Sequence, residues 1–198
     1  MFILLPLIFL ILLIYASIKI ISSVGKKYPA AVPEGLSGVG GWLTFQIGGL
    51  IAWGPVFGFL LSFSSFSNAE RDHPGMAEYA PWQNFKLMFW LQLLVLIGWG
   101  IYSGYRLLVK RTPSVVDAAK LYYKCAPLFA IATIFMSYIA FGQLTGEVVG
   151  QSIGTIFSSV ISSLIWIAYF NRSVRVRNTY GYRLKEQEQT SSSEKIEV

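Results

Sequence analysis

Three glutamines interrupt otherwise apolar stretches of this chain and are the side chains best placed to do chemistry inside them. Gln46, Gln92 and Gln143 each carry an amide that both donates and accepts hydrogen bonds. Because hydrocarbon offers no partners for such groups, we expect all three to face the interior of a helical bundle. There they would either form hydrogen bonds between helices or line a polar site for a small solute. The sequence leaves both roles open.

Ionisable side chains are missing from the middle of the apolar stretches, where proton relays and ion-coupled transporters usually place them. The chain also contains no nucleophile–base arrangement, phosphate-binding loop or nucleotide motif. The single histidine, His73, lies near scattered carboxylates without the spacing of a structural zinc site. We therefore expect no catalytic residue, no metal site and no cofactor, and predict that the protein is not an enzyme.

The composition indicates that the solvent of this chain is lipid. Of its 198 residues, 54% are hydrophobic and only 13% are charged, whereas a soluble domain carries about 25% charged residues. A net charge of +6 could also indicate a protein that binds nucleic acid. The lysines and arginines lie beside apolar runs, however, so the predicted partner is the bilayer and not nucleic acid.

Five apolar segments are long enough to cross a bilayer, which requires about 20 residues. They cover residues 2–21, 42–63, 87–109, 125–145 and 150–170. The predicted fold class is an all-α integral membrane protein, with a four-helix transmembrane core and an N-terminal transmembrane anchor helix. The predicted units are the anchor at 1–24, a Pro/Gly-rich linker at 25–41, a four-span domain at 42–180 and a disordered cytoplasmic tail at 181–198. A cleaved or surface-lying first segment is the alternative to the anchor.

Breaks between the spans are predicted from proline, glycine and polar residues. Pro55 lacks an amide hydrogen, so a kink is expected near Gly54 and Pro55. The polar residues 64–86 are interpreted as a loop in which Pro81 and Trp82 open the next helix, and residues 112–124 as a basic, partly helical loop. The Gly-Glu-Val-Val run at 146–149 is interpreted as a tight turn.

The distribution of positive charge predicts the orientation. Of the 16 lysines and arginines, only Arg71 and Lys86 would lie on the outer side of a five-span layout. The predicted location is the plasma membrane (bacterial inner membrane), multi-pass, with the N-terminus outside and the C-terminus in the cytoplasm. The last span ends in an aromatic collar followed by three arginines, and these either contact anionic lipid or a partner, or only set the topology: Arg172, Arg175 and Arg177.

Glycines recur at four-residue spacing within the spans, as in Gly100 and Gly104. In lipid such pairs let helix backbones approach closely. We interpret them as packing contacts within the bundle, with a dimer face as the alternative.

Two motifs resemble those of the domain of unknown function 2569 family. Residues 38–45 read Gly-Val-Gly-Gly-Trp-Leu-Thr-Phe, and residues 165–180 read Ile-Trp-Ile-Ala-Tyr-Phe-Asn-Arg-Ser-Val-Arg-Val-Arg-Asn-Thr-Tyr. The resemblance covers roughly residues 35–180 and leaves out the first span and the tail. It implies a mostly bacterial membrane protein with four spans and no established activity, so it transfers no catalytic residue. The N-terminal span is an addition to the family pattern.

Two classes of function remain open. The first is a non-catalytic scaffold or accessory subunit that holds a membrane protein partner or a second copy of itself. The second is a small transporter or solute-binding helical bundle that uses Gln46, Gln92 and Gln143. The lack of ionisable groups inside the spans favours the first class.

Overall fold

The computed structural model describes residues 4–33, 35–142 and 146–182, and the regular elements in these ranges are helical. The described part contains five helices long and apolar enough to cross a membrane, including an N-terminal one, which confirms the predicted fold class. The elements are α1 (Leu4–Gly25), α2 (Trp42–Gly48), the π-helix η1 (Gly49–Trp53), α3 (Gly54–Asp72), the 3-10 helix η2 (Pro74–Glu78), α4 (Ala80–Val109), α5 (Pro113–Phe141), α6 (Gly146–Arg172) and α7 (Val174–Tyr180).

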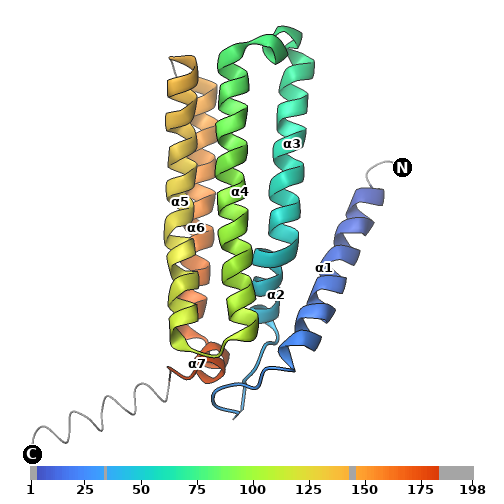
Figure 1. Ribbon diagram of the computed structural model, residues 1–198, viewed down its shortest axis with the longest axis vertical. Coiled ribbons are helices and arrows are strands. Elements are labelled where there is room, and N and C mark those ends of the chain that lie inside the picture. Colours follow the sequence, from blue (N-terminus) through green and yellow to red (C-terminus); the bar gives the residue numbers. More distant parts are fainter. Residues whose placement is uncertain (1–3, 34, 143–145, 183–198) are drawn as a thin grey trace, which may run out of the picture.

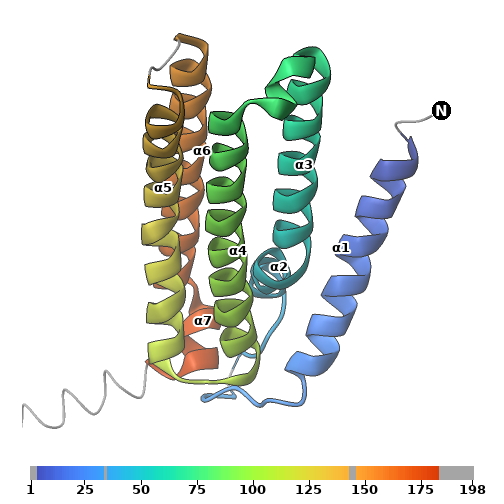
Figure 2. The same ribbon diagram turned by 45° about the horizontal axis from the view of Figure 1, so that its top comes forward.

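The long helices run side by side between two ends, which we name after the short helix at each: the α7 end and the η2 end (Figure 1). Helix α4 packs against α5, and α5 packs against α6. Helices α2 and α3 form one rod with η1 between them. Helix α1 contacts α2, η1 and α4 at the α7 end, and both views show it diverging from α3 toward its N-terminus (Figures 1 and 2).

Buried side chains in the described residues gather near the two ends of the bundle. The larger cluster lies at the α7 end and joins α1, α2, α4, α5, α6 and α7; its largest members are Tyr180, Phe170, Leu43 and Ile47. The smaller cluster, at the η2 end, contains Phe66, Trp82 and Phe85. Between these clusters most apolar side chains face outward, as expected where the surrounding phase is lipid.

The predicted break in the second span is confirmed and takes the form of a π-helix. The amide of Gly54 donates to the carbonyl of Gly49, five residues back, and Pro55 follows without an amide hydrogen. A Cβ at position 54 would collide with the Gly49 oxygen, so glycine is required there by this close approach. The wider turn places Trp53 over Gly48 and Gly49, where larger residues would not fit.

Gly104 serves packing within the bundle, as predicted for the spaced glycines. A Cβ at Gly104 would lie 2.7 Å from Cγ1 of Ile51 and 3.0 Å from Cβ of Leu50, so α4 approaches the π-helix through this glycine. Gly100 faces the ring of Tyr122 on α5. The two glycines therefore pack against two different neighbouring elements of the same chain.

Three predicted loop positions were wrong. Residues 64–86 are largely helical, because α3 continues to Asp72 and α4 begins at Ala80; Phe66 is held by edge contacts to Trp82 and Phe85. The basic stretch 112–124 was predicted to be a loop that is only partly helical; it is helical from Pro113 onward and continues without a break into the rest of α5. These polar residues were interpreted as loops. A helix that is longer than the bilayer is thick extends into water at its ends, however, so its terminal turns are polar.

The third error concerns the connection between the last two spans. Helix α5 ends at Phe141, and Gly142 follows in the left-handed conformation with φ 70° that commonly stops a helix. Residues 146–149, predicted as the turn, belong to α6. The glycine and glutamate that were expected to form the turn therefore lie in the first turn of α6.

We expect Gly54→Ala to lower the thermal stability of the detergent-purified protein. The added methyl group must displace the Gly49 carbonyl, and overpacking of this kind costs about 1–3 kcal/mol. Gly98→Ala is the matched control, because a Cβ there would meet no atom within 4 Å. A Gly54→Ala protein that unfolds at or above the temperature of the Gly98→Ala protein would contradict the π-helix.

Candidate functional site

Gln92 forms hydrogen bonds between two spans. Its amide nitrogen donates to the carbonyl of Phe129 at 2.8 Å and to Oγ1 of Thr133 at 2.9 Å, both on α5. Thr133 also donates to Phe129 at 3.1 Å. An amide in a membrane span gains from such partners because lipid provides none. This geometry matches the first of the two roles predicted for the in-span glutamines.

The other glutamines do not join Gln92 in the described structure. Gln46 is buried, with 3% of its surface exposed, and lies in α2 at the α7 end, whereas Gln92 lies in the half of α4 nearer the η2 end (Figure 1). Gln143 lies outside the described residues. A shared solute site of the three glutamines stays a prediction.

The most extensively built polar region lies instead at the α7 end, where α7 folds back under the bundle. Ser173 begins the helix: its hydroxyl accepts from the amide of Val176 at 3.4 Å, and Gly181 ends it with φ 72°. Helix α7 buries one face completely, through Val176, Thr179 and Tyr180. The chain therefore does not run straight out of the last span.

The Pro/Gly-rich linker is packed onto α7 by hydrogen bonds that involve its backbone. Side chains on α7 donate to carbonyls of the linker: Arg175 to Ser37 at 3.1 Å, Asn178 to Leu36 at 3.3 Å and Thr179 to Gly38 at 3.3 Å. In return the amides of Ala31 and Val32 donate to carbonyls of Thr179 and Asn178 at 3.1 and 3.0 Å. The stretches that carry the two family-like motifs thus contact each other.

Arg111 connects this region to α1. Its guanidinium donates to the carbonyl of Leu107 at 2.7 Å, to Tyr28 at 3.3 Å and to Gly25 at 3.4 Å. It also lies over the ring of Tyr180, 5.8 Å from the centroid. Burial lowers the pKa of Arg111 from its ordinary value, and the partners are carbonyls and an aromatic ring. Arg111 therefore joins the end of α1 to the end of α4.

Two tyrosines of the C-terminal segment close the region. Tyr180 is fully buried, and its hydroxyl donates to the carbonyl of Leu107 at 2.6 Å. Burial raises the pKa of Tyr180 far above its ordinary value, so the hydroxyl keeps its proton and remains a donor. The hydroxyl of Tyr182 donates to Asp117 on α5 at 2.9 Å, and burial followed by this carboxylate raises the pKa of Tyr182 as well.

The three arginines predicted to contact lipid or a partner have different surroundings. Arg172 is exposed at the end of α6, and Val174 beside it is exposed too. Arg175 is partly buried and bonded to the linker, close enough to Gly40 that a Cβ there would lie 2.6 Å from its Nη1. Arg177 is partly buried and also has an interaction within the protein.

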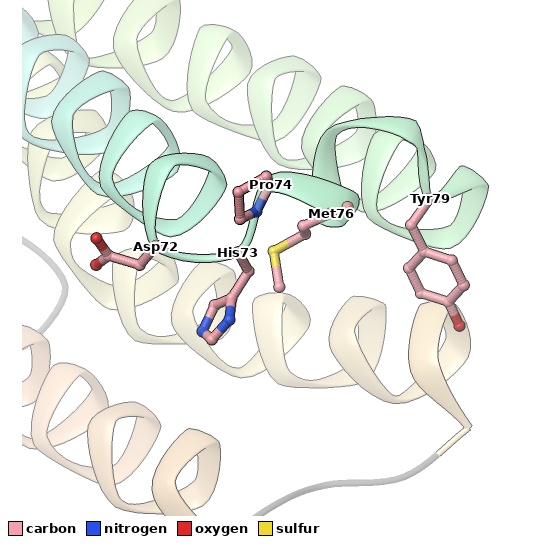
Figure 3. Close-up of a pocket in the computed structure, with 6 residues that line it drawn as sticks. Asp72, His73, Pro74, Met76 and Tyr79 are labelled. Carbon is pink, nitrogen blue, oxygen red and sulfur yellow. The ribbon is translucent and has the colours of Figure 1, made fainter.

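The η2 end has a smaller polar group and a shallow surface pocket. Lys86 and Trp82 both donate to Oε1 of Glu70, at 2.5 and 2.9 Å, which joins α3 to α4. The pocket nearby is lined by six residues, five of which are labelled in Figure 3: Asp72, His73, Pro74, Met76 and Tyr79. Among the described residues, no group of three or more His, Cys, Asp or Glu side chains gathers around it or elsewhere.

Sequence reasoning missed the roles of Arg111, Tyr180 and Tyr182. A serine at position 173 and a glycine at position 181 do bracket a short helix, since these residues favour its two ends, and that signal was available. Apart from Leu107, which is four residues before Arg111, the partners of the three side chains lie 65 to 86 residues away in the chain. No local pattern could have indicated them.

We expect Tyr180→Phe to reduce the free energy of unfolding by about 1 kcal/mol, the net value of a hydrogen bond, while Arg111 still serves the Leu107 carbonyl. Thermal unfolding in detergent measures the change. Tyr138→Phe is the control, because the Tyr138 side chain is exposed on α5. Equal unfolding temperatures for the two variants would show that the buried hydrogen bond contributes nothing.

Comparison with known proteins identifies the family and leaves the activity undetermined. No curated protein and no solved structure matches the chain. The sequence profile described as "Protein of unknown function (DUF2569)" matches residues 36–181, from the linker that packs on α7 to the glycine that ends α7. The matched segment is more than half of the chain and includes α2 to α7 but not α1. This multi-span membrane protein therefore belongs to the DUF2569 family.

Proposed function

We propose that the protein is a non-catalytic scaffold or accessory subunit that docks a membrane protein partner at its α7 end. The observation that carries this proposal is the way α7, the linker and Arg111 build one surface from separate parts of the chain. Segments that are fixed in this way present a preorganised surface, which lowers the entropy cost of binding.

The outer side of this surface offers groups that a partner can contact. Arg172 and Val174 are exposed at the junction where α6 ends and α7 begins. Arginine is among the residues enriched at protein interfaces. Arg172 is therefore the residue that we assign to partner contact.

The use of the in-span amide supports a scaffold more than a solute-binding bundle. Gln92 gives its donors to α5 and thereby holds two spans together. If the alternative function holds, replacing Gln46, Gln92 and Gln143 with leucine abolishes a solute-dependent phenotype in protein that still folds. An unchanged phenotype would exclude that form of the alternative.

We propose that the α7 end faces the cytoplasm and that the protein lies in the plasma membrane. Apart from Lys86, the basic residues of α1, α4, α5 and α7 lie toward this end, as expected for a cytoplasmic side. At the η2 end, Lys86 is paired with Glu70, and Arg71 lies 3.8 Å from Asp72, so acidic groups offset both positive charges.

Cysteine labelling in intact cells tests the orientation. In a Cys125→Ser background, Gly75→Cys places a thiol in η2 and Ser114→Cys places one in the exposed first turn of α5. A membrane-impermeant maleimide should label position 75 in intact cells and position 114 only after lysis. The reverse pattern would invert the proposed orientation, and labelling of both in intact cells would contradict a sealed crossing between them.

Native mass spectrometry after gentle detergent extraction at low salt tests the scaffold. We expect a second protein at fixed stoichiometry, and we expect Arg172→Glu to reduce its share several-fold because charge reversal at an interface is repulsive. Arg71→Glu, at the exposed opposite end, should leave the complex intact. A lone protein that carries a retained small molecule would overturn the scaffold in favour of the solute-binding bundle.

A further inference from the structure

Tyr102, Arg106 and Lys110 form a ridge on α4 at the α7 end. Tyr102 and Arg106 are four residues apart, so their side chains lie one above the other on a single face of the helix, and Lys110 follows just beyond its end. Tyr102 is 59% exposed, and neighbouring Tyr105 is 57% exposed. Gly98 continues the ridge toward the middle of the span, and a Cβ there would meet no atom within 4 Å. Tyr102, Lys110 and Gly98 are therefore open to the surroundings, and Arg106 between them is partly buried.

Arg106 lies at the depth of the lipid headgroups. Counting from 86 to 106, twenty residues separate Lys86 from Arg106 on α4. At about 1.5 Å per residue this is about 30 Å, the thickness of a hydrocarbon core. The two cations thus bracket the membrane-spanning part of the helix, and exposed tyrosines beside the second cation are typical of the interface.

The protein leaves the Arg106 guanidinium without a carboxylate. Its Nε is buried and has no hydrogen-bond acceptor among the described residues, and its guanidinium lies 5.5 Å from the centroid of the Tyr102 ring. In the part of the α7 end that the structure describes, the one acidic residue is Asp117, which accepts from Tyr182 and Lys120. A guanidinium without a carboxylate partner at this depth favours pairing with an anion at the membrane surface.

We propose that this ridge binds the phosphate of an anionic phospholipid, with Arg106 and Lys110 as the ligands and Tyr102 as the platform beside them. The planar guanidinium donates two parallel hydrogen bonds to phosphate, and the lysine adds a second charge at the membrane surface. The acyl chains lie along the open side of Gly98. This site is distinct from Arg175, whose guanidinium is bonded to the linker.

Lipid titration of the purified full-length protein tests the site. Native mass spectrometry would measure binding of phosphatidylglycerol and of phosphatidylcholine to the wild type and to three variants: Arg106→Gln, Lys110→Gln and Lys124→Gln. We expect each of the first two to weaken phosphatidylglycerol binding about fivefold, the factor that corresponds to about 1 kcal/mol per basic residue at a membrane surface. Lys124→Gln is the control, because Lys124 is an exposed cation on α5 outside the ridge.

The outcomes separate a built site from general surface charge. Equal weakening by all three variants would overturn the ridge as a specific site, as would unchanged binding in Arg106→Gln and Lys110→Gln. Displacement of the lipid by inorganic phosphate at matched concentration would reassign the site to a soluble anion and overturn the lipid proposal. If Arg106→Gln does not yield folded protein, Lys110→Gln decides the question, because Lys110 is exposed and lies just beyond the end of α4.

Discussion

The backbone carbonyls at the α7 end impose the constraint on which the arrangement of the helices depends. A helix leaves its last carbonyls without amide partners, and a buried carbonyl without a donor is costly. At Leu107 the donors are the hydroxyl of Tyr180 and the guanidinium of Arg111. Arg111 also donates hydrogen bonds to the carbonyls of Gly25 and Tyr28. The guanidinium that bonds the end of α4 therefore also fixes the end of α1.

The two motifs that define the family segment have a shared structural purpose. The second supplies side-chain donors on α7, and these bind the carbonyl of Gly38, the first residue of the first motif, and the carbonyls of Leu36 and Ser37 just before it. These contacts hold the linker and α7 together at one end of the bundle.

The bundle combines two packed ends with a lipid-facing middle. Tight contacts through Gly104 and the π-helix hold the α7 half together, while Phe66, Trp82 and Phe85 hold α3 to α4 at the η2 end. Helix α1 shares only the first of these regions.

The sequence by itself determined the solvent, the class of fold, the five apolar spans and the break before Pro55, because hydropathy, charge and proline act locally. It misplaced the connections at 64–86, 112–124 and 146–149, since polar turns of long helices look like loops. The tertiary structure alone decided which groups meet: Gln92 with α5, and Arg111 with α1 and Tyr180. Such contacts depend on how distant helices pack, and packing is a property of the whole chain.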